Sequence, residues 1–324
     1  MKAIMRSSYG PPGGLTLRDV DMPRVGKGQL LVRVRAASLN AGDLDYLYGR
    51  PPMARLAIGL RGPRNRRLGL DVAGEVEAIG KGVTRFQVGD AVFGDMTQAG
   101  FGAFAEYVSA PQNAFAPKPA SLTFEQAATV PQAAVLAMQG LSGGRPIRSG
   151  QRVLINGASG SVGPFAVQIA KAFGAEVTGV CSTAKMDLVR SAGADHVIDY
   201  TAVDFTRAGQ RYDRILDISA RRSLLATRRV LNPGGTYVLI GGSTLRVLES
   251  VILGPLISIA GSRRMGIDWS WKPMRPETVA ALTKLIDSGA VRPMIDRSYP
   301  LSELPAALRY LEQGHARGKI VIAT

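Results

Sequence analysis

The chain of 324 residues has room for about two domains of ordinary size, and its 46% hydrophobic and 20% charged residues exclude a disordered chain. Its one cysteine, Cys181, excludes an intramolecular disulfide and a multi-cysteine zinc site. The 40 Lys and Arg residues against 25 Asp and Glu give a formal charge of +15, which favours anionic ligands.

The first 110 residues predict short strands joined by turns, and from about residue 120 helices and strands alternate. Segments 28–40, 71–80 and 82–94 are β-rich and interrupted by glycine. The later segments predict strands at 153–155, 176–182, 196–200, 214–219 and 236–242, and helices at 161–173, 184–191 and 221–231, the last stopped by "NPGG". This alternation predicts an α/β fold with a doubly wound parallel sheet, covered by helices on both faces.

After about residue 266 the pattern changes again. It predicts helices at 276–289 and 302–314 and strands at 291–299 and 318–324. These last strands have no sheet of their own, so we expect them to return to the β-rich N-terminal part. The predicted domains are therefore a discontinuous β-rich domain, 1–115 with 267–324, and a nucleotide-binding domain, 116–266.

The segment "NGASGSVG", 156–163, lies between a predicted strand and a predicted helix. Compared with G-x-G-x-x-G, it places Ala158, Gly160 and Gly163 at the three glycine positions. Gly160 would let a pyrophosphate approach the backbone, and Gly163 would let the helix pack on the strand. The helix, predicted to begin near Ser161, would direct its free N–H groups at the phosphates. The predicted site also includes Ser159 and Val162; a tight turn without a ligand is the alternative.

The next strand end indicates which dinucleotide would bind. NAD sites carry an acidic residue about 20 residues after the glycines, but here the sequence has Ser182, Thr183 and Lys185. Hydroxyls and an ammonium suit a 2′-phosphate, so the sequence favours NADPH. Tyr200, at the end of the following strand, would flank the same pocket. The alternatives are an ordinary exposed helix lysine and a strand-end core tyrosine.

These segments resemble the zinc-independent quinone oxidoreductases of the medium-chain dehydrogenase/reductase superfamily. The resemblance covers essentially the whole chain and rests on the motifs "NGASGSVGPFAVQIAKAFGAEVTGVCS", "GADHVIDY", "LGLDVAGEVEAIGKGVTRFQVGDAVFG" and "GHARGKIVI". Within that group the chain is similar to the branch with reticulon-interacting quinone oxidoreductases and plant alkenal/one oxidoreductases. The resemblance implies a GroES-like catalytic domain, a Rossmann domain, an active-site cleft between them, and NADPH as cofactor.

The same comparison addresses zinc. Zinc alcohol dehydrogenases of this superfamily carry a cysteine in C-x-x-D and a Gly-His-Glu signature, whereas the matching positions here are Asn40-x-x-Asp43 and Gly69-Leu70-Asp71. Leucine cannot ligate a metal and asparagine is a poor zinc ligand. We therefore expect no metal, and hydride transfer to an activated C=C bond or a quinone rather than alcohol oxidation.

The resemblance places Asn40 and Asp43 near the nicotinamide. Tyr46 and Tyr48 follow closely and would donate a hydrogen bond or proton to the developing oxyanion, or else only line the cleft. The resemblance also brings His315 and Arg317 to the cofactor, although a surface histidine is the alternative for His315. Gly241 and Gly242 are further predicted cofactor contacts. Trp269 and Trp271 are expected either on the substrate side or in domain packing.

The predicted function is therefore reduction of a quinone or α,β-unsaturated carbonyl by NADPH. The alternatives are an enoyl-thioester reductase and a low-turnover protein that binds NADPH and RNA, because the positive charge tolerates loose nucleic-acid binding without favouring it. The start of the chain lacks the apolar core of a signal peptide, and 247–260 is too short to span a bilayer, so we expect a cytoplasmic location without membrane insertion. An apolar edge strand at 256–264 predicts a homodimer, unless a terminal helix or loop covers that strand.

Overall fold

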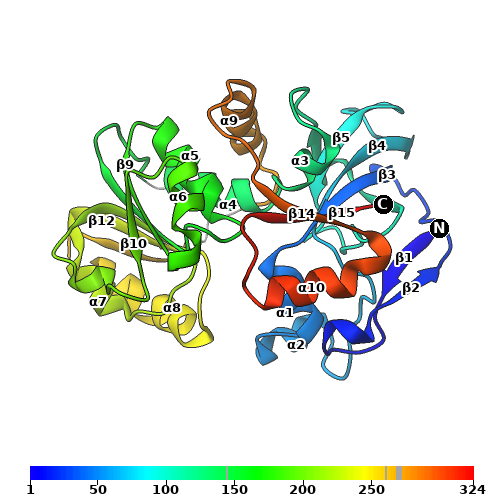
Figure 1. The fold of residues 1–324 in the computed structure, drawn as a ribbon. Helices are drawn as coiled ribbons and strands as arrows, with labels where there is room; N and C mark the ends of the chain where they lie inside the picture. Colours follow the sequence, from blue (N-terminus) through cyan, green and yellow to red (C-terminus); the bar gives the residue numbers. More distant parts are fainter. Residues whose placement is uncertain (144, 260, 268–271) are drawn as a thin grey trace. The chain divides into compact units, whose positions relative to one another are not determined.

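The last strands of the chain pair with strands near its beginning. The computed structural model describes residues 1–143, 145–259, 261–267 and 272–324, so the two tryptophans of 268–271 lie outside the described residues (Figure 1). The chain divides into a β-rich unit (Met1–Val135, Pro273–Thr283 and Pro293–Thr324) and an α/β unit (Leu136–Lys272 and Lys284–Arg292).

Among the described residues, seven strands form the main sheet of the β-rich unit. Six follow one another in the order β14-β15-β3-β4-β5-β7, and β6 also pairs with β3. Their bounds are β3 Gln29–Ser38, β4 Asp71–Ile79, β5 Ala91–Asp95, β6 Tyr107–Pro111, β7 Phe115–Pro117, β14 Ile295–Pro300 and β15 Lys319–Ala323. Val321 of β15 lies opposite Ser38 of β3 in antiparallel register, as expected for C-terminal strands that return to the N-terminal part. Within the predicted β-rich segment 82–94, only residues 91–94 form a strand, and they belong to β5.

Helices and a small second sheet complete this unit. Leu304, Ala307 and Leu308 lie at helical spacing on α10 and are buried against the strands. The strands β1 and β2 pair antiparallel. The bounds of these elements are β1 Lys2–Met5, β2 Thr16–Asp19, α1 Ala41–Tyr48, α2 Arg55–Ile58, α3 Phe124–Ala128 and α10 Leu304–Glu312.

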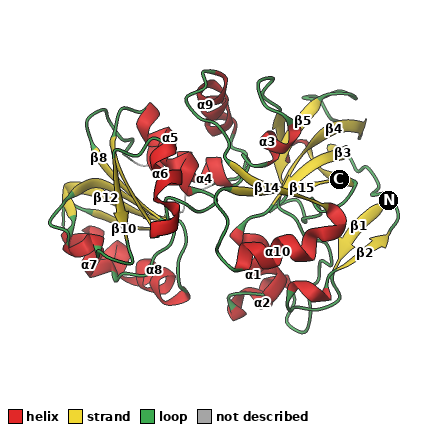
Figure 2. Ribbon diagram, in the orientation of Figure 1, coloured by secondary structure: helices red, strands yellow, loops and turns green. Residues whose placement is uncertain are grey.

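The α/β unit contains a parallel sheet with the strand order β10-β9-β8-β11-β12-β13 in its described part. The bounds are β8 Arg152–Asn156, β9 Glu176–Cys181, β10 His196–Asp199, β11 Tyr212–Asp217, β12 Leu231–Leu239 and β13 Arg264–Ile267. Figure 2 shows α5 (Gly163–Ala172) and α6 (Met186–Ser191) on one side of the sheet, with α7 (Leu224–Arg229) and α8 (Thr244–Ile259) on the other. The prediction of a doubly wound parallel sheet is confirmed. Two further helices are α4 Ala133–Ser142 and α9 Pro276–Asp287.

One predicted helix boundary is wrong. We expected a helix at 221–231 stopped by "NPGG", but α7 covers only Leu224–Arg229 and residues 232–235 belong to β12. The Ser223 side chain accepts a hydrogen bond from the Ala226 amide and so begins the helix later. Leu231 already pairs with Tyr212, and the register then shifts, so the turn residues form an irregularity inside the strand.

The predicted edge strand at 256–264 is also wrong in its position. Residues 256–259 are the end of α8, and the edge strand is β13. A Cβ on Gly254 would come within 2.6 Å of the Met265 carbonyl oxygen, so the helix packs closely on this strand. An apolar run of this length suits a helix as well as a strand, and periodicity alone does not separate them.

Candidate functional site

The glycine turn joins β8 to α5. Gly157 takes a φ of +86°, so it supplies the left-handed residue of the turn, whereas Ala158 is buried. A Cβ on Gly163 would lie 2.3 Å from the Ala158 carbonyl carbon and oxygen, so glycine is required there by packing within the chain. The helix begins at Gly163 rather than near Ser161.

Gly160 differs from these two glycines. It is exposed, its φ lies outside the left-handed region, and a Cβ would meet nothing closer than the Gly157 oxygen at 3.5 Å. The described chain therefore supplies no reason for glycine at this position, which fits a group that approaches from outside. Ser161 and Val162 are half-buried beside it, Ser159 is buried, and no side chain caps the start of α5. The turn fits the pyrophosphate of a dinucleotide.

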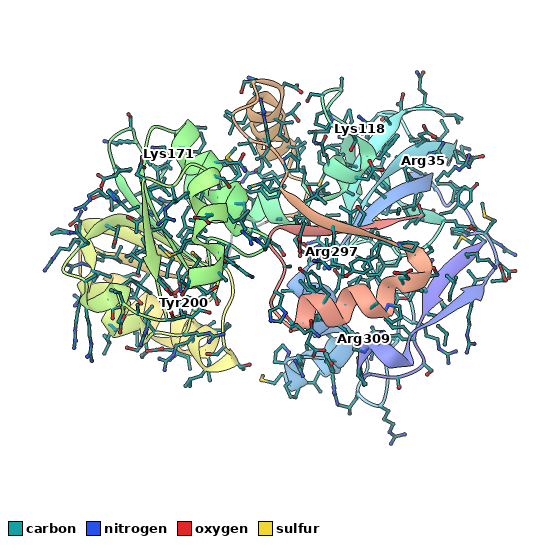
Figure 3. All side chains as sticks on the ribbon, viewed as in Figure 1. Arg35, Lys118, Lys171, Tyr200, Arg297 and Arg309 are labelled. Carbon is teal, nitrogen blue, oxygen red and sulfur yellow. The ribbon has the colours of Figure 1, made fainter. Side chains whose placement is uncertain are left out.

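The next strand end carries the residues predicted to recognise the 2′-phosphate. Ser182 directly follows β9, and Thr183 and Lys185 lie on a short 3₁₀ helix (Thr183–Lys185). Tyr200, labelled in Figure 3, is 49% exposed and so is not a core residue. The chain therefore presents hydroxyls, an amine and a phenol at this strand end.

Sequence reasoning missed an acidic residue at the same place. Asp199 lies opposite Cys181 in the β10–β9 pairing, and the Thr183 hydroxyl donates a hydrogen bond to it. The Thr201 amide and hydroxyl donate to its other oxygen at 2.9 and 2.7 Å. The bond from Thr183, with those from Thr201, lowers the pKa of Asp199. The sequence did contain a signal, because Asp199 directly precedes Tyr200, which was predicted to flank this pocket.

Gly241 and Gly242 follow the end of β12. A Cβ on Gly242 would lie 2.6 Å from the Ala220 Cβ, and one on Gly241 would lie 3.0 Å from the Ile218 oxygen. Packing against residues 218–220 therefore accounts for both glycines, and their predicted cofactor contact stays a prediction.

A buried polar network lies at the carboxyl ends of β8 and β11. Asn156 Nδ2 donates to Asp217 Oδ1 at 2.7 Å, and the Tyr237 hydroxyl donates to Asp217 Oδ2 at 3.2 Å. Burial raises the pKa of Asp217 to about 6, although these two hydrogen bonds act in the opposite direction.

Asp217→Asn should change the pH dependence of stability. The folded-state pKa of about 6 exceeds the ordinary 3.8, so between these values the folded state binds the extra proton and wild-type stability rises as the pH falls. The amide can still accept from Asn156 and donate to Tyr237. Relative to the variant, the free energy of unfolding of the wild type should increase by about 1 kcal/mol for each pH unit below about 6. Denaturant unfolding of both proteins at pH 7.5 and pH 5 measures this. A difference in free energy of unfolding between wild type and variant that is the same at both pH values would contradict the prediction.

In the β-rich unit, Asn40 and Asp43 lie at the start of α1. The Asn40 backbone amide donates to Asp43 Oδ2 at 2.8 Å, so the two residues fix each other. Burial raises the pKa of Asp43 well above its usual range, and its Oδ1 has no hydrogen-bond partner among the described residues. The pattern of the sequence did not predict this helix.

Asn40 also joins a buried cluster that sequence reasoning missed. Its Nδ2 donates to Asp71 Oδ2 at 2.9 Å, and its Oδ1 accepts from Lys319 Nζ at 2.6 Å. Lys319 Nζ lies 3.5 Å from Asp71 Oδ2. Burial raises the pKa of Asp71 to about 7 and lowers that of Lys319, while their opposite charges counteract both shifts.

The two predicted tyrosines have different surroundings. Tyr46 is half-buried with its ring centroid 4.4 Å from that of Phe101, and burial, then the charges of Asp95 and Asp43, raise its pKa. Its hydroxyl therefore stays protonated and suits hydrogen-bond donation. The Tyr48 hydroxyl instead donates to Glu312 Oε1 at 2.8 Å.

His315 and Arg317 are exposed in the turn before β15. The Arg317 backbone amide donates to Asp296 Oδ2 at 3.1 Å, which fixes the main chain there and leaves the guanidinium at the surface. Their predicted contacts with the cofactor stay predictions.

Zinc does not fit the residues at the matching positions. Leu70 is buried and has no donor atom, while Asn40 and Asp71 are both bonded to the Lys319 ammonium. Within the described residues, no group of three or more His, Cys, Asp or Glu side chains could hold a metal ion. The described helices also include none that is long and apolar enough to cross a membrane.

Comparison with known proteins gives consistent matches. A family model described as an alcohol dehydrogenase GroES-like domain matches residues 26–120, and one described as a zinc-binding dehydrogenase matches residues 192–322. The mouse (Mus musculus) protein "NAD(P)H oxidoreductase RTN4IP1, mitochondrial" is 34% identical over 91% of this chain and 81% of its own length. The Arabidopsis thaliana "NADPH-dependent alkenal/one oxidoreductase, chloroplastic" is 30% identical over 99% of this chain and 79% of its own.

A solved structure agrees with these matches. The quinone oxidoreductase from Coxiella burnetii is 31% identical with a TM-score of 0.88, over 100% of this chain and 99% of that one. The resemblance inferred from the motifs is confirmed. The chain belongs to the quinone-oxidoreductase-like NAD(P)H-dependent oxidoreductases of the medium-chain dehydrogenase/reductase superfamily.

Proposed function

We propose that the protein reduces a quinone or an α,β-unsaturated carbonyl with NADPH and without a metal. The observation that carries the cofactor part is Gly160, an exposed glycine for which the described chain supplies no packing or backbone reason. The choice of hydride acceptor rests on Leu70, Asn40 and Asp71. These side chains offer no site for a metal ion that would act as a Lewis acid, because leucine has no donor atom and the other two bond Lys319. An electron-poor carbon accepts hydride without such activation.

NADPH, when bound, supplies the hydride. The turn around Gly160 and the first amides of α5 would hold the pyrophosphate, and Lys185 with Ser182 and Tyr200 would hold the 2′-phosphate. The protonated Tyr46 hydroxyl would donate a hydrogen bond to the acceptor oxygen as negative charge develops there. Because burial and then the charges of nearby carboxyls raise the pKa of Tyr46, its hydroxyl would keep its proton, and the proton that completes the reduction would come from solvent.

Absorbance of the reduced nicotinamide tests this function. We expect NADPH oxidation with 1,4-quinones and short 2-alkenals, and slower oxidation with a crotonyl thioester. Faster turnover of the thioester would favour an enoyl-thioester reductase. Salt-dependent RNA binding that competes with NADPH, with negligible turnover, would favour an interaction protein. Metal-stimulated alcohol oxidation without turnover of these acceptors would overturn the proposal.

We also propose that the protein is a homodimer. Helix α8 exposes an apolar stripe, with Leu248 54%, Leu256 60% and Ile259 84% exposed, beside the edge strand β13. Unpaired edges and exposed apolar patches of this kind are commonly covered by a second copy of the same chain.

The double substitution Leu248→Glu with Leu256→Glu should convert a dimer into a monomer. The carboxylates would have to be buried without partners in the interface, at a cost of several kcal/mol. Light scattering should therefore give twice 34.3 kDa for the wild type and 34.3 kDa for the variant. Leu60→Glu, at a leucine of the β-rich unit that is 67% exposed, is the matched control. A wild-type monomer would show that the stripe needs no partner.

A further inference from the structure

Lys319 is a fully buried lysine at the start of β15. Its ammonium lies 3.0 Å from the Leu39 carbonyl oxygen and 2.6 Å from Asn40 Oδ1, and Asp71 Oδ2 lies 3.5 Å away. The carboxyls of Asp43 and Asp95 are near enough for their charges to act on it. Asp43 and Asp95 each keep a buried oxygen without a hydrogen-bond partner among the described residues.

The bonds of this lysine determine the orientation of the Asn40 side chain. An ammonium only donates hydrogen bonds, and Asp71 Oδ2 accepts from Ser38, Asn40 and Lys319 in this arrangement. The Asn40 oxygen must therefore face Lys319 and its nitrogen must face Asp71, as observed. The carboxamide keeps one N–H for another partner. The lysine thus supplies a donor at the oxygen end of the amide, and Asp71 supplies the acceptor at its nitrogen end.

Stability alone does not explain a lysine here. A buried ion pair loses much of its hydration, and a well-packed apolar pair of similar volume is often equally or more stable. One role of such a pair is to fix the arrangement of the groups around it. In this case the arranged group is Asn40.

The lysine also bonds two positions with a parallel in the zinc-dependent dehydrogenases. Asn40 matches the cysteine of their C-x-x-D motif, and Asp71 matches the glutamate of their Gly-His-Glu signature. Here an ammonium, not a metal ion, is the cation that these two side chains share.

We propose that Lys319 is a positioning residue for hydride transfer, whose ammonium replaces the metal as the shared cation and holds the Asn40 carboxamide in one orientation. This inference rests on the proposed function, in which Asn40 lies near the nicotinamide. Lys319 has no exposed surface and therefore acts through Asn40, not on the acceptor itself.

A double-mutant cycle on kcat tests the proposal, with wild type, Lys319→Met, Asn40→Ala and the double variant. We expect Lys319→Met to lower kcat on the order of 10- to 100-fold, since small misplacements at a reacting centre have effects of this size. In the Asn40→Ala background the same change should lower kcat less than about two-fold. The Kd for NADPH, from nicotinamide fluorescence, should stay within about two-fold of wild type. Lys81→Met, at an exposed lysine of the same unit, is the matched control.

Lys319→Met leaves Asp71 buried without its cation, a change that can prevent folding by itself. The variant Lys319→Met with Asp71→Asn removes both charges, and the new amide oxygen can still accept from Asn40. It should fold, by its unfolding midpoint, and still show the loss of kcat.

The inference would be overturned by an unchanged kcat in a folded lysine variant. It would also be overturned if the losses of kcat caused by Lys319→Met and by Asn40→Ala multiplied in the double variant. Either result would leave the proposed function intact. Failure of both lysine variants to fold would overturn the inference as well, because the lysine would then be required for structure. A wild type without turnover of any acceptor would instead overturn the proposed function, and the inference with it.

Discussion

Gly160→Val should raise the Kd for NADPH by about 100-fold or more and leave the unfolding midpoint of the free protein nearly unchanged. A Cβ at this position has no close neighbour in the chain and the backbone is not left-handed, so the folded protein tolerates it. A branched side chain would occupy the space where a pyrophosphate approaches the backbone amides. Several hydrogen bonds to a charged group would be lost together, each worth about 1.5–3 kcal/mol. Fluorescence titration with NADPH and thermal unfolding measure the two quantities.

Gly163→Ala is the matched control and should give the opposite pattern. Its Cβ would lie 2.3 Å from the Ala158 carbonyl group, so the turn must shift, at a cost of about 1–3 kcal/mol of stability. The unfolding midpoint should fall even without NADPH. If Gly160→Val destabilised the free protein as much as Gly163→Ala does, the turn would be a tight connection without a ligand.

Local patterns predicted most of the fold. The alternation of short apolar strands with helices predicted the parallel sheet. The glycine turn was recognised because it lies between a strand and a helix. The errors arose where tertiary packing decided between two local possibilities. The "NPGG" segment suits a helix end, but pairing of Leu231 with Tyr212 places it inside β12. The apolar segment 256–264 is equally suited to a strand or a helix, and its first residues are the end of α8, a helix that packs on β13 at Gly254.

The candidate site was predicted in part, for the same reason. The family resemblance pointed to Asn40 and Asp43, which bond each other at the start of α1, a helix that the sequence pattern did not predict. Lys319 is separated from Asn40 by 279 positions, and only the pairing of β15 with β3 brings them together. A lysine in an otherwise apolar final strand was the one available signal. Asp199 reaches the end of β9 through strand pairing as well.

Lys185→Glu should raise the Kd for NADPH on the order of 10- to 100-fold and change the Kd for NADH by less than about two-fold. A charge-assisted hydrogen bond to a phosphate contributes about 1.5–3 kcal/mol, and the new carboxylate would also repel the phosphate. NADH lacks the 2′-phosphate and so loses neither interaction. Equal affinity for NADPH before and after the change would make Lys185 an ordinary surface lysine.

Asp199→Asn should shift the cofactor preference in the opposite direction. The carboxylate of Asp199 is held by Thr183 and Thr201 at the strand end where the 2′-phosphate would bind, and its pKa is lowered, so it is ionised at neutral pH. An asparagine keeps an oxygen that accepts hydrogen bonds but removes the negative charge. The Kd for NADPH should fall several-fold, the Kd for NADH should stay nearly constant, and raising the salt concentration should reduce the difference. Titration of both cofactors at low and high salt measures this. If both Kd values rose together, Asp199 would instead serve the ribose of either cofactor, and the preference for NADPH would lose its electrostatic basis.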